Sequence, residues 1–235
     1  MEKQGKLDNL NIFAENDVLT MDSTFLKSQD INHKYVYRFL KRLMDIFGSM
    51  IGLIVLSPLF LIIAIAIKKE EKKGPVFFSQ TRIGKNGKEF KMYKFRSMCV
   101  NAENKLNELL KSNEVEGAMF KIKDDPRVTK TGKFIRKTSI DELPQLLNVL
   151  KGDMSLVGPR PPLEREVEEY STYDKQRLLI KPGCTGVWQI SGRNDVGFDE
   201  MVKMDIGYIR NLSIINDIKI IFKTAWVMIK PNGAY

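Results

Sequence analysis

The sequence of 235 residues has one histidine and two cysteines, which excludes several kinds of functional site. With His33 as the single imidazole, Ser-His-Asp and Cys-His catalysis are disfavoured, and the HExxH motif and most zinc sites are excluded. Cys99 and Cys184 lie far apart and form no CxxC motif, so a reducing compartment is the simpler expectation. A chain of this length can bury a core without disulfides.

The charge is basic overall but unevenly distributed. The net charge is +9, and residues 1–33, with three lysines and six acidic residues, carry −3, which leaves +12 on residues 34–235. This excess favours anionic partners such as phospholipid, phosphorylated substrates or nucleic acid. Residues 1–33 predict an acidic, flexible extension. No signal peptide is indicated, because the first long apolar run begins too far along the chain.

Residues 46–67 form a run of 22 residues without a charge, which is long enough to cross a bilayer. Pro58 follows Ser57 near its middle and divides it into halves of about half the hydrocarbon thickness. Lysines and arginines flank both ends, so both ends favour the cytoplasmic side. A re-entrant helix–break–helix accounts for both facts, whereas a proline-kinked span accounts for the length. The residues alone leave both interpretations open.

Beyond this segment the sequence predicts a mixed α+β domain. Residues 76–80 and 89–95 predict strands joined at Asn86–Gly87, and residues 187–190 a further strand. Residues 101–111, 139–150 and 163–179 predict helices, and residues 121–131 a loop. Residues 198–229 predict amphipathic helices rich in aromatic residues and lysines, which suit either a membrane interface or the closure of a soluble core.

The densest polar constellation surrounds Asp141 and Glu142. Ser139 and Glu142 have capping-box spacing, while Pro144 favours Asp141 as the N-cap. Either register puts both carboxylates at a helix N-terminus, where the helix dipole favours their ionised forms. Such a pair can hold Mg²⁺, or one carboxylate can attack an electrophile. The alternative is an ordinary cap followed by a first-turn acid.

Cations occur in several motifs: Lys94 and Arg96 within residues 94–98, Arg160 within a proline-locked loop, and Arg193 after Ser191–Gly192. Arginine forks match phosphate oxygens. Each arginine taken alone is better explained by a contact with solvent or a lipid headgroup. Together with the carboxylates they indicate phosphate chemistry in which a carboxylate acts.

The order and content of these motifs closely resemble the bacterial sugar transferases of the monotopic phosphoglycosyl transferase family. The resemblance covers about residues 35–230, with Cys184 and Trp188–Gln189 as small departures away from the presumed chemistry. The matching segments are residues 41–45, Ser57–Pro58, 80–84, 93–98, 138–161, 181–186 and 191–194.

The resemblance implies an α+β, mostly helical monotopic membrane protein on the cytoplasmic face of the bacterial inner membrane. Residues 34–73 would form the re-entrant membrane helix, broken at Ser57 and Pro58, so the resemblance favours this form over a span. Residues 74–235 would form the catalytic domain, with a small β-hairpin and amphipathic interfacial helices. Larger relatives have a multi-span N-terminal region that this sequence lacks, and we expect partners to supply regulation.

The resemblance also implies an activity. The family transfers a sugar-1-phosphate from a UDP-sugar to undecaprenyl phosphate, giving undecaprenyl-diphosphate-sugar and UMP, and so initiates capsule, exopolysaccharide or related glycan synthesis. Asp141 matches the nucleophile of a ping-pong mechanism, and Glu142 completes a pair that places Mg²⁺. Expected phosphate- or nucleotide-binding residues are Lys94, Arg96, Arg136, Pro159, Arg160, Pro161 and Arg193.

Expected partners are the UDP-sugar, undecaprenyl phosphate, membrane lipid, a second copy of the chain and other glycan-assembly enzymes. Two other classes compete with this function. A non-catalytic membrane scaffold would make Asp141 and Glu142 dispensable. A nucleic-acid binder fits the basic charge, but no recognition-helix or zinc-finger signature supports it. The transferred sugar is not readable from the shared motifs.

Overall fold

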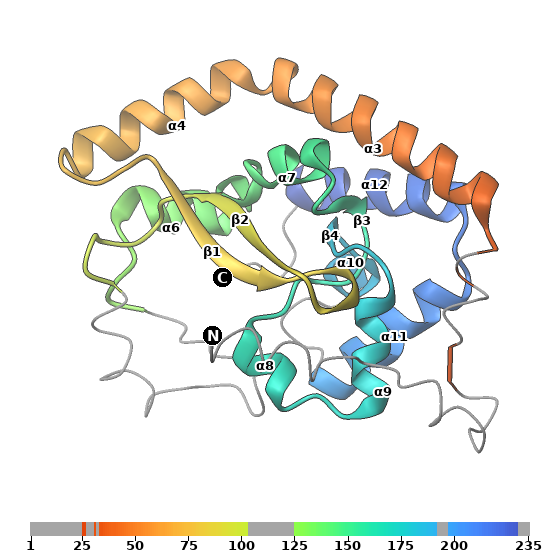
Figure 1. Ribbon diagram of the computed structural model, residues 1–235. Coiled ribbons are helices and arrows are strands. Elements are labelled where there is room, and N and C mark those ends of the chain that lie inside the picture. The colour runs from red at the N-terminus through yellow and green to blue at the C-terminus, as the bar shows by residue number, and fades with distance from the viewer. Residues whose placement is uncertain (1–24, 27–30, 32, 103–124, 192–196, 230–235) are drawn as a thin grey trace.

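The computed structural model describes residues 25–26, 31, 33–102, 125–191 and 197–229. Two long helices, α3 (Tyr35–Val55) and α4 (Ser57–Glu70), run end to end as a bent layer along one side, at the top of Figure 1. Beneath it, α3 contacts α7 (Gln145–Lys151) and α12 (Ile214–Ile229), while α4 contacts α6 (Lys130–Lys137). The structure therefore has a mostly helical α+β architecture.

The bend between α3 and α4 occurs at the position that the sequence predicts. The two helices meet at an angle of 58° on either side of Leu56, and Pro58 lies in the first turn of α4. Proline has no amide N–H to donate to the carbonyl of Ile54, four residues earlier. The Ser57 hydroxyl donates to that carbonyl instead, at 2.8 Å. Ser57 and Pro58 thus allow the helix to bend without leaving the Ile54 carbonyl unpaired.

No single helix in the described ranges is both long and apolar enough to cross a membrane. The bent pair α3–α4 passes that test when the two helices are taken together, by length and composition. The buried residues are Asp45 and Ser49 on α3 and Ile63 and Ile67 on α4. Many other large apolar side chains are exposed on this layer, among them Val36, Phe39, Phe47, Ile51, Ile54, Val55, Leu61 and Ile62.

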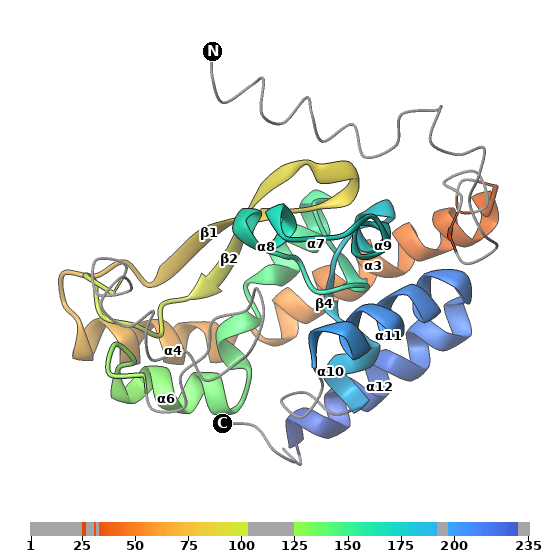
Figure 2. The same cartoon turned by 90° about the horizontal axis from the view of Figure 1, so that it is seen from below.

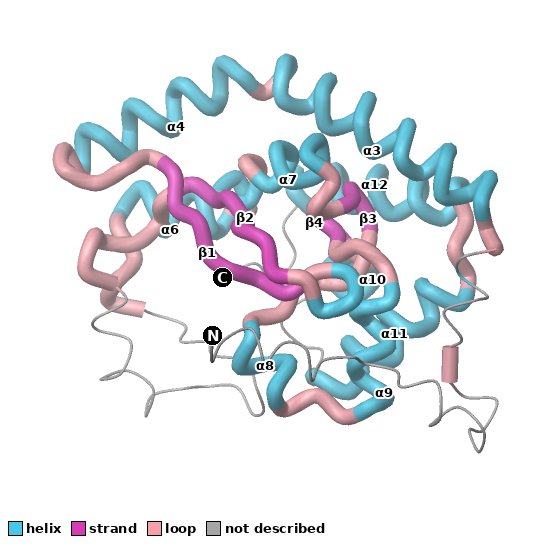
Figure 3. Tube along the Cα trace, viewed as in Figure 1, coloured by secondary structure: helices cyan, strands magenta, loops and turns pink. Residues whose placement is uncertain are grey.

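A β-hairpin lies below α4 and is formed by β1 (Phe77–Ile83) and β2 (Glu89–Phe95), which pair antiparallel with Phe77 opposite Phe95 (Figure 3). Its turn, η2 (Lys85–Gly87), has positive φ at Asn86 (56°) and Gly87 (75°), which asparagine and glycine tolerate best. The predicted hairpin is confirmed, with the first strand beginning one residue later and running three residues further than expected.

A second, parallel pair joins β3 (Ser155–Val157) to β4 (Gly183–Thr185). The backbones of Gly158 and Gly183 approach so closely that a Cβ atom on Gly183 would collide with the Gly158 amide nitrogen. Glycine is required there because any side chain would separate the two segments. This contact fixes the start of the proline-rich loop that follows β3.

Several sequence predictions for secondary structure are wrong. Residues 163–179 form three short pieces, α8 (Glu164–Glu168), α9 (Thr172–Lys175) and η5 (Gln176–Leu179), because Ser171 and Asp174 form a reciprocal capping box that starts a new helix. Residues 187–190 belong to helix α10 (Val187–Ser191), since a short apolar run suits either state. Helix α6 begins within the predicted loop, where Thr129 caps it. The predicted helix 101–111 lies almost wholly outside the described residues.

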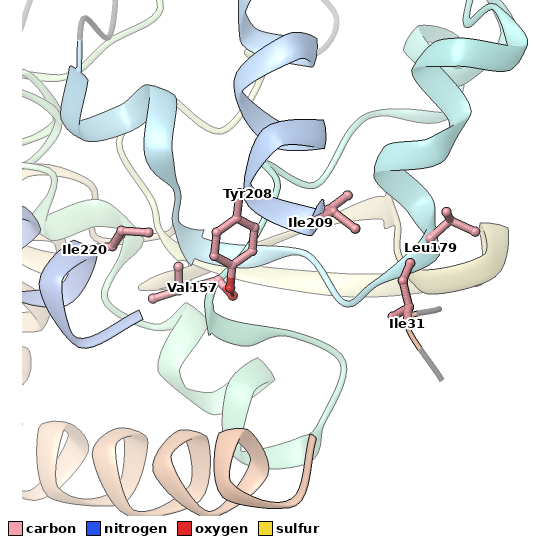
Figure 4. Close-up of a cluster of buried hydrophobic side chains, with 6 residues drawn as sticks. All are labelled: Ile31, Val157, Leu179, Tyr208, Ile209 and Ile220. Carbon is pink, nitrogen blue, oxygen red and sulfur yellow. Dashed lines mark hydrogen bonds between the residues drawn. The ribbon is translucent and has the colours of Figure 1, made fainter. Parts of the chain in front are cut away.

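The two C-terminal helices differ in how far their apolar side chains are buried. Helix α11 (Phe198–Arg210) buries Met201, Val202, Ile206, Tyr208 and Ile209, so it closes the core. Figure 4 shows one part of that core, where Tyr208 and Ile209 meet Val157, Leu179, Ile31 and Ile220. Helix α12 lies beside α3, as both cartoon views show (Figures 1 and 2), and exposes Ile215, Ile218, Phe222 and Trp226.

Candidate active site

Asp141 and Glu142 lie on a single 3₁₀ turn, η4 (Ile140–Glu142), immediately before α7. Ser139 precedes the turn in the left-handed region, at φ 57°, and makes no side-chain cap. The expected capping box between Ser139 and Glu142 is therefore wrong, and Pro144, not Asp141, takes the N-cap position of α7. With Pro144 at that position, the 3₁₀ turn precedes α7, and neither carboxylate caps that helix.

The carboxylate turn is held against the hairpin through a buried amide. Asn148 of α7 accepts a hydrogen bond from the Tyr93 amide at 3.0 Å and donates to the Lys91 carbonyl at 2.7 Å. These two bonds mimic a strand partner and fix α7 along β2. Lys94, the next residue on β2, donates to Glu142 Oε1 at 2.6 Å. The predicted proximity of Lys94 to the carboxylate pair is thus observed.

The two adjacent carboxylates have opposite electrostatic environments. Burial, opposed by the charge of Lys94 and reinforced by that of Glu142, raises the pKa of Asp141 to about 6. Burial also acts to raise the pKa of Glu142. The charge and hydrogen bond of Lys94, and the smaller effects of the charges of Arg160 and Arg82, outweigh burial and lower this pKa overall. A pair whose pKa values are driven apart is characteristic of sites that assign different tasks to two acids.

Arg160, whose charge acts on Glu142, lies on a rigid loop between buried Pro159 and Pro161. Its guanidinium forms an ion pair with Glu166 at 3.0 Å, and Glu166 in turn accepts from the Leu163 amide at 2.8 Å. The loop is thereby fixed at its base. The charge of Arg160 is among the causes that lower the pKa of Glu142, so the loop lies near the carboxylate pair.

Arg82 is a further cation of this site that the sequence analysis did not single out. It is buried on β1, donates to the Pro161 carbonyl at 3.1 Å and to Gln80 at 2.8 Å, and leaves its Nε without a partner in the described structure. Burial and then the charge of Arg160 lower the pKa of Arg82 to about 10. Only its membership of the matching segment 80–84 marked it in the sequence.

The remaining predicted cations have different positions. Arg136, exposed on α6, lies close enough for its charge to lower the pKa of Asp141. Arg96 instead donates to the Pro75 carbonyl at 2.9 Å and lies over the Phe78 ring, so no contact joins it to the carboxylates. Arg193 lies outside the described residues. The phosphate-binding roles of all three stay predictions.

A divalent cation would find two acidic ligands here. Within the described ranges no group of three or more histidine, cysteine or acidic side chains converges as a cation cage. Mg²⁺ is commonly bound by one or two carboxylates together with substrate phosphates, so Asp141 and Glu142 fit a site completed by a substrate. Hard carboxylate oxygens are the donors that this ion prefers.

The fold and the site define a protein that combines a buried carboxylate with cations suited to phosphate, beneath a bent apolar helix layer. The chain belongs to the bacterial sugar transferase family, whose model matches residues 36–231.

Curated relatives share this core. The chain is 48% identical over 243 residues to galactosyl transferase CpsE of Streptococcus agalactiae, covering all of this chain and 54% of that protein. It is 46% identical over 222 residues to undecaprenyl-phosphate galactose phosphotransferase of Salmonella typhimurium (93% and 46% covered), and 45% over 199 residues to exopolysaccharide production protein ExoY of Sinorhizobium fredii (83% and 88%). The chain thus spans about half the length of the first two.

Proposed function

We propose that this protein transfers a sugar-1-phosphate from a UDP-sugar to undecaprenyl phosphate, giving undecaprenyl-diphosphate-sugar and UMP, as the first membrane step of capsule or exopolysaccharide synthesis. The observation that carries the proposal is the buried Asp141 carboxylate, with a pKa of about 6, on a turn surrounded by Lys94, Arg82 and Arg160. The names of the relatives support the reaction class and make UDP-galactose the first donor to test.

The proposed chemistry proceeds in two displacements at one phosphorus atom. An Asp141 oxygen attacks the β-phosphorus, the bond from that phosphorus to the bridging oxygen breaks, and UMP leaves with the bonding electrons. The resulting acyl phosphate is then attacked by an oxygen of undecaprenyl phosphate, which restores the Asp141 carboxylate. Burial supports the first step, since a poorly solvated carboxylate with a raised pKa is a stronger nucleophile and is still mostly ionised at pH 7.

The cations would neutralise the diphosphate during this attack. Lys94 and Arg160 approach from the Glu142 side, and the unpartnered Nε of Arg82 is available as a donor. Mg²⁺, bound through Asp141 and Glu142, would supply Lewis-acid stabilisation of the phosphate oxygens. Glu142, held ionised by Lys94, would keep a constant negative charge at the site.

We further propose a monotopic arrangement on the cytoplasmic face of the bacterial inner membrane. The 58° bend at Ser57–Pro58, the basic flanks of α3–α4 and the apolar side chains exposed on α3, α4 and α12 support a re-entrant insertion with α12 at the interface. This arrangement would bring the active site to the depth of the lipid phosphate. We also propose that the protein forms a homodimer and contacts other glycan-assembly enzymes.

The test measures UMP release by membrane fractions given undecaprenyl phosphate, Mg²⁺ and a panel of UDP-sugars. Asp141→Asn should abolish release, whereas Asp199→Asn, the same change at an exposed carboxylate on α11, should leave it unchanged. Radiolabelled donor without lipid acceptor should label wild-type protein through a bond that hydroxylamine cleaves. Retained turnover in Asp141→Asn would remove Asp141 from the nucleophile role, and absence of UMP with every donor would favour the scaffold alternative.

A further inference from the structure

A second cluster of cations lies away from the carboxylate turn, beneath the N-terminal half of α3. It lines a pocket of about 510 Å³ formed by α3, the hairpin turn, β3 and the segment between η5 and β4. The basic side chains that line it are Arg38, Lys41, Arg42, Lys85 and Lys181. None of the cations around Asp141 and Glu142 is among the lining residues, so this pocket is separate from the candidate active site.

Of these cations, Lys41 is paired with a carboxylate, that of Asp217 at 3.1 Å, but within the described residues the others are not. Arg38, Lys85 and Lys181 form no ion pair with any acidic residue in the part of the chain that the structure describes. The Asp45 carboxylate, which also lines the pocket, is already engaged by the Ser155 hydroxyl at 3.0 Å and the Leu156 amide at 2.9 Å. The pocket therefore has an excess of positive charge.

The like charges also face one another at close range. A Cβ atom on Gly152 would lie 3.4 Å from both Arg42 Nη2 and Lys181 Nζ, so these groups approach the same point. Burial and then the charges of Arg38 and Lys181 lower the pKa of Lys85. Arg42 is fixed there because it donates to the Val149 and Leu150 carbonyls at the end of α7, at 2.7 and 2.9 Å. Gathering these charges costs free energy unless an anion binds between them.

The remaining walls indicate what kind of anion fits. Tyr35 and Phe39 line the pocket and are 67% and 65% exposed, on the same helix whose apolar side chains face outward, whereas Ile31 and Val157 are buried. Three converging cations match the several oxygens of a phosphate group better than a single carboxylate. We propose that this pocket binds a phosphate group through Arg38, Lys85 and Lys181, supplied either by the headgroup of a membrane lipid or by a soluble phosphate compound.

Binding to the 235-residue chain in a neutral detergent tests this proposal, with dihexanoyl phosphatidic acid, inorganic phosphate and, as a lipid without phosphate, dihexanoylglycerol as probes. Isothermal titration calorimetry measures the affinity, and thermal unfolding confirms that each variant is folded. Lys85→Gln and Lys181→Gln should each weaken phosphatidic acid binding by about tenfold. Lys88→Gln is the matched control, because Lys88 is an exposed lysine at the same hairpin turn outside the pocket.

The probes distinguish the two sources of phosphate. Binding of phosphatidic acid at least tenfold tighter than inorganic phosphate assigns the site to a lipid, and equal affinity assigns it to a soluble phosphate compound. Asp141→Asn should bind both probes as the wild type does, so this readout is independent of the transfer reaction. Absence of binding to either anion, equal weakening in Lys85→Gln and Lys88→Gln, or equal affinity for dihexanoylglycerol would overturn the proposal.

Discussion

Asp141 and Asp205 are both buried carboxylates, 8% and 1% exposed, yet their surroundings differ. Asp205 accepts a hydrogen bond from Arg177 Nε at 2.8 Å, and Arg177 also donates to the Tyr170 hydroxyl at 2.7 Å. No other side chain in the described structure donates a hydrogen bond to Asp141, which faces Lys94 and Arg136 only through their charge. The ion pair between Asp205 and Arg177 holds two parts of the fold together. The carboxylate of Asp141, which accepts no hydrogen bond from another described side chain, stays available to a reactant.

The two regions are nevertheless connected. Arg177 Nη2 reaches the Arg160 carbonyl at 3.4 Å, so the Arg177–Asp205 pair supports the loop that carries Arg160 near the carboxylate turn. The structural pair therefore acts on the candidate site by positioning. Matched isosteric changes in the two regions should separate a stabilising carboxylate from a reactive one.

The largest effect on stability is expected from Asp205→Asn. It leaves the Arg177 guanidinium buried without its counter-charge, which should lower the free energy of unfolding by about 3 kcal/mol. Urea unfolding in detergent, followed by tryptophan fluorescence, measures the change. The exposed change Asp199→Asn serves as control, and a loss no greater than in that control would show that the buried pair is not needed for stability.

Lys94→Met should have the next largest effect, on turnover. The Lys94 ammonium lies 2.6 Å from Glu142, and its charge lowers the pKa of Asp141. Because the substitution removes this cation, we expect kcat to fall by about 100-fold. Lys91→Met, on the same strand but bonded to Thr81 at 2.8 Å, is the matched control. Equal rates for the two variants would separate Lys94 from the chemistry.

The pH dependence of the transfer rate should also differ between the wild type and Lys94→Met, by a smaller amount. Because Asp141 must be ionised to attack, activity should fall about tenfold per unit below an apparent pKa of about 6. Lys94 lowers the pKa of Asp141, so in Lys94→Met this acid limb should move upward by about one unit. Initial rates of UMP release from pH 4.5 to 8 measure it. An acid limb near pH 4 in the wild type would contradict the desolvated state of Asp141.

The sequence predicts the local features of the site better than its surroundings. The hairpin turn at Asn86–Gly87 and the helix break at Ser57–Pro58 follow from residues whose backbone preferences dominate their neighbours. The short helices after Leu163 were not predictable from the same pattern, because their ends depend on the reciprocal cap of Ser171 and Asp174 and on tertiary contacts.

The same division applies to the site residues. Lys94 and Arg160 approach Glu142 as the motifs indicate, but the capping register of Asp141 came out wrong. Arg82 contributes through a contact 79 residues away in sequence, to Pro161, and local spacing cannot show such a contact. Burial of Asp141 is likewise a tertiary property. The effect of this burial on the free energy of unfolding is the smallest of the effects that we predict.

Asp141→Asn should stabilise the protein slightly while it abolishes transfer. The raised pKa means that ionising Asp141 is more costly in the folded chain than in the unfolded chain, so the ionised group destabilises the fold at pH above about 6. Removing that charge should raise the free energy of unfolding at pH 8 by about 1–2 kcal/mol, and most of this difference should be lost at pH 4, near the pKa of 3.8 of the unfolded carboxyl. Urea unfolding at both pH values, beside Asp205→Asn, measures the contrast. If both asparagine variants lose stability at pH 8, Asp141 holds the structure as Asp205 does, and the distinction between the two regions fails.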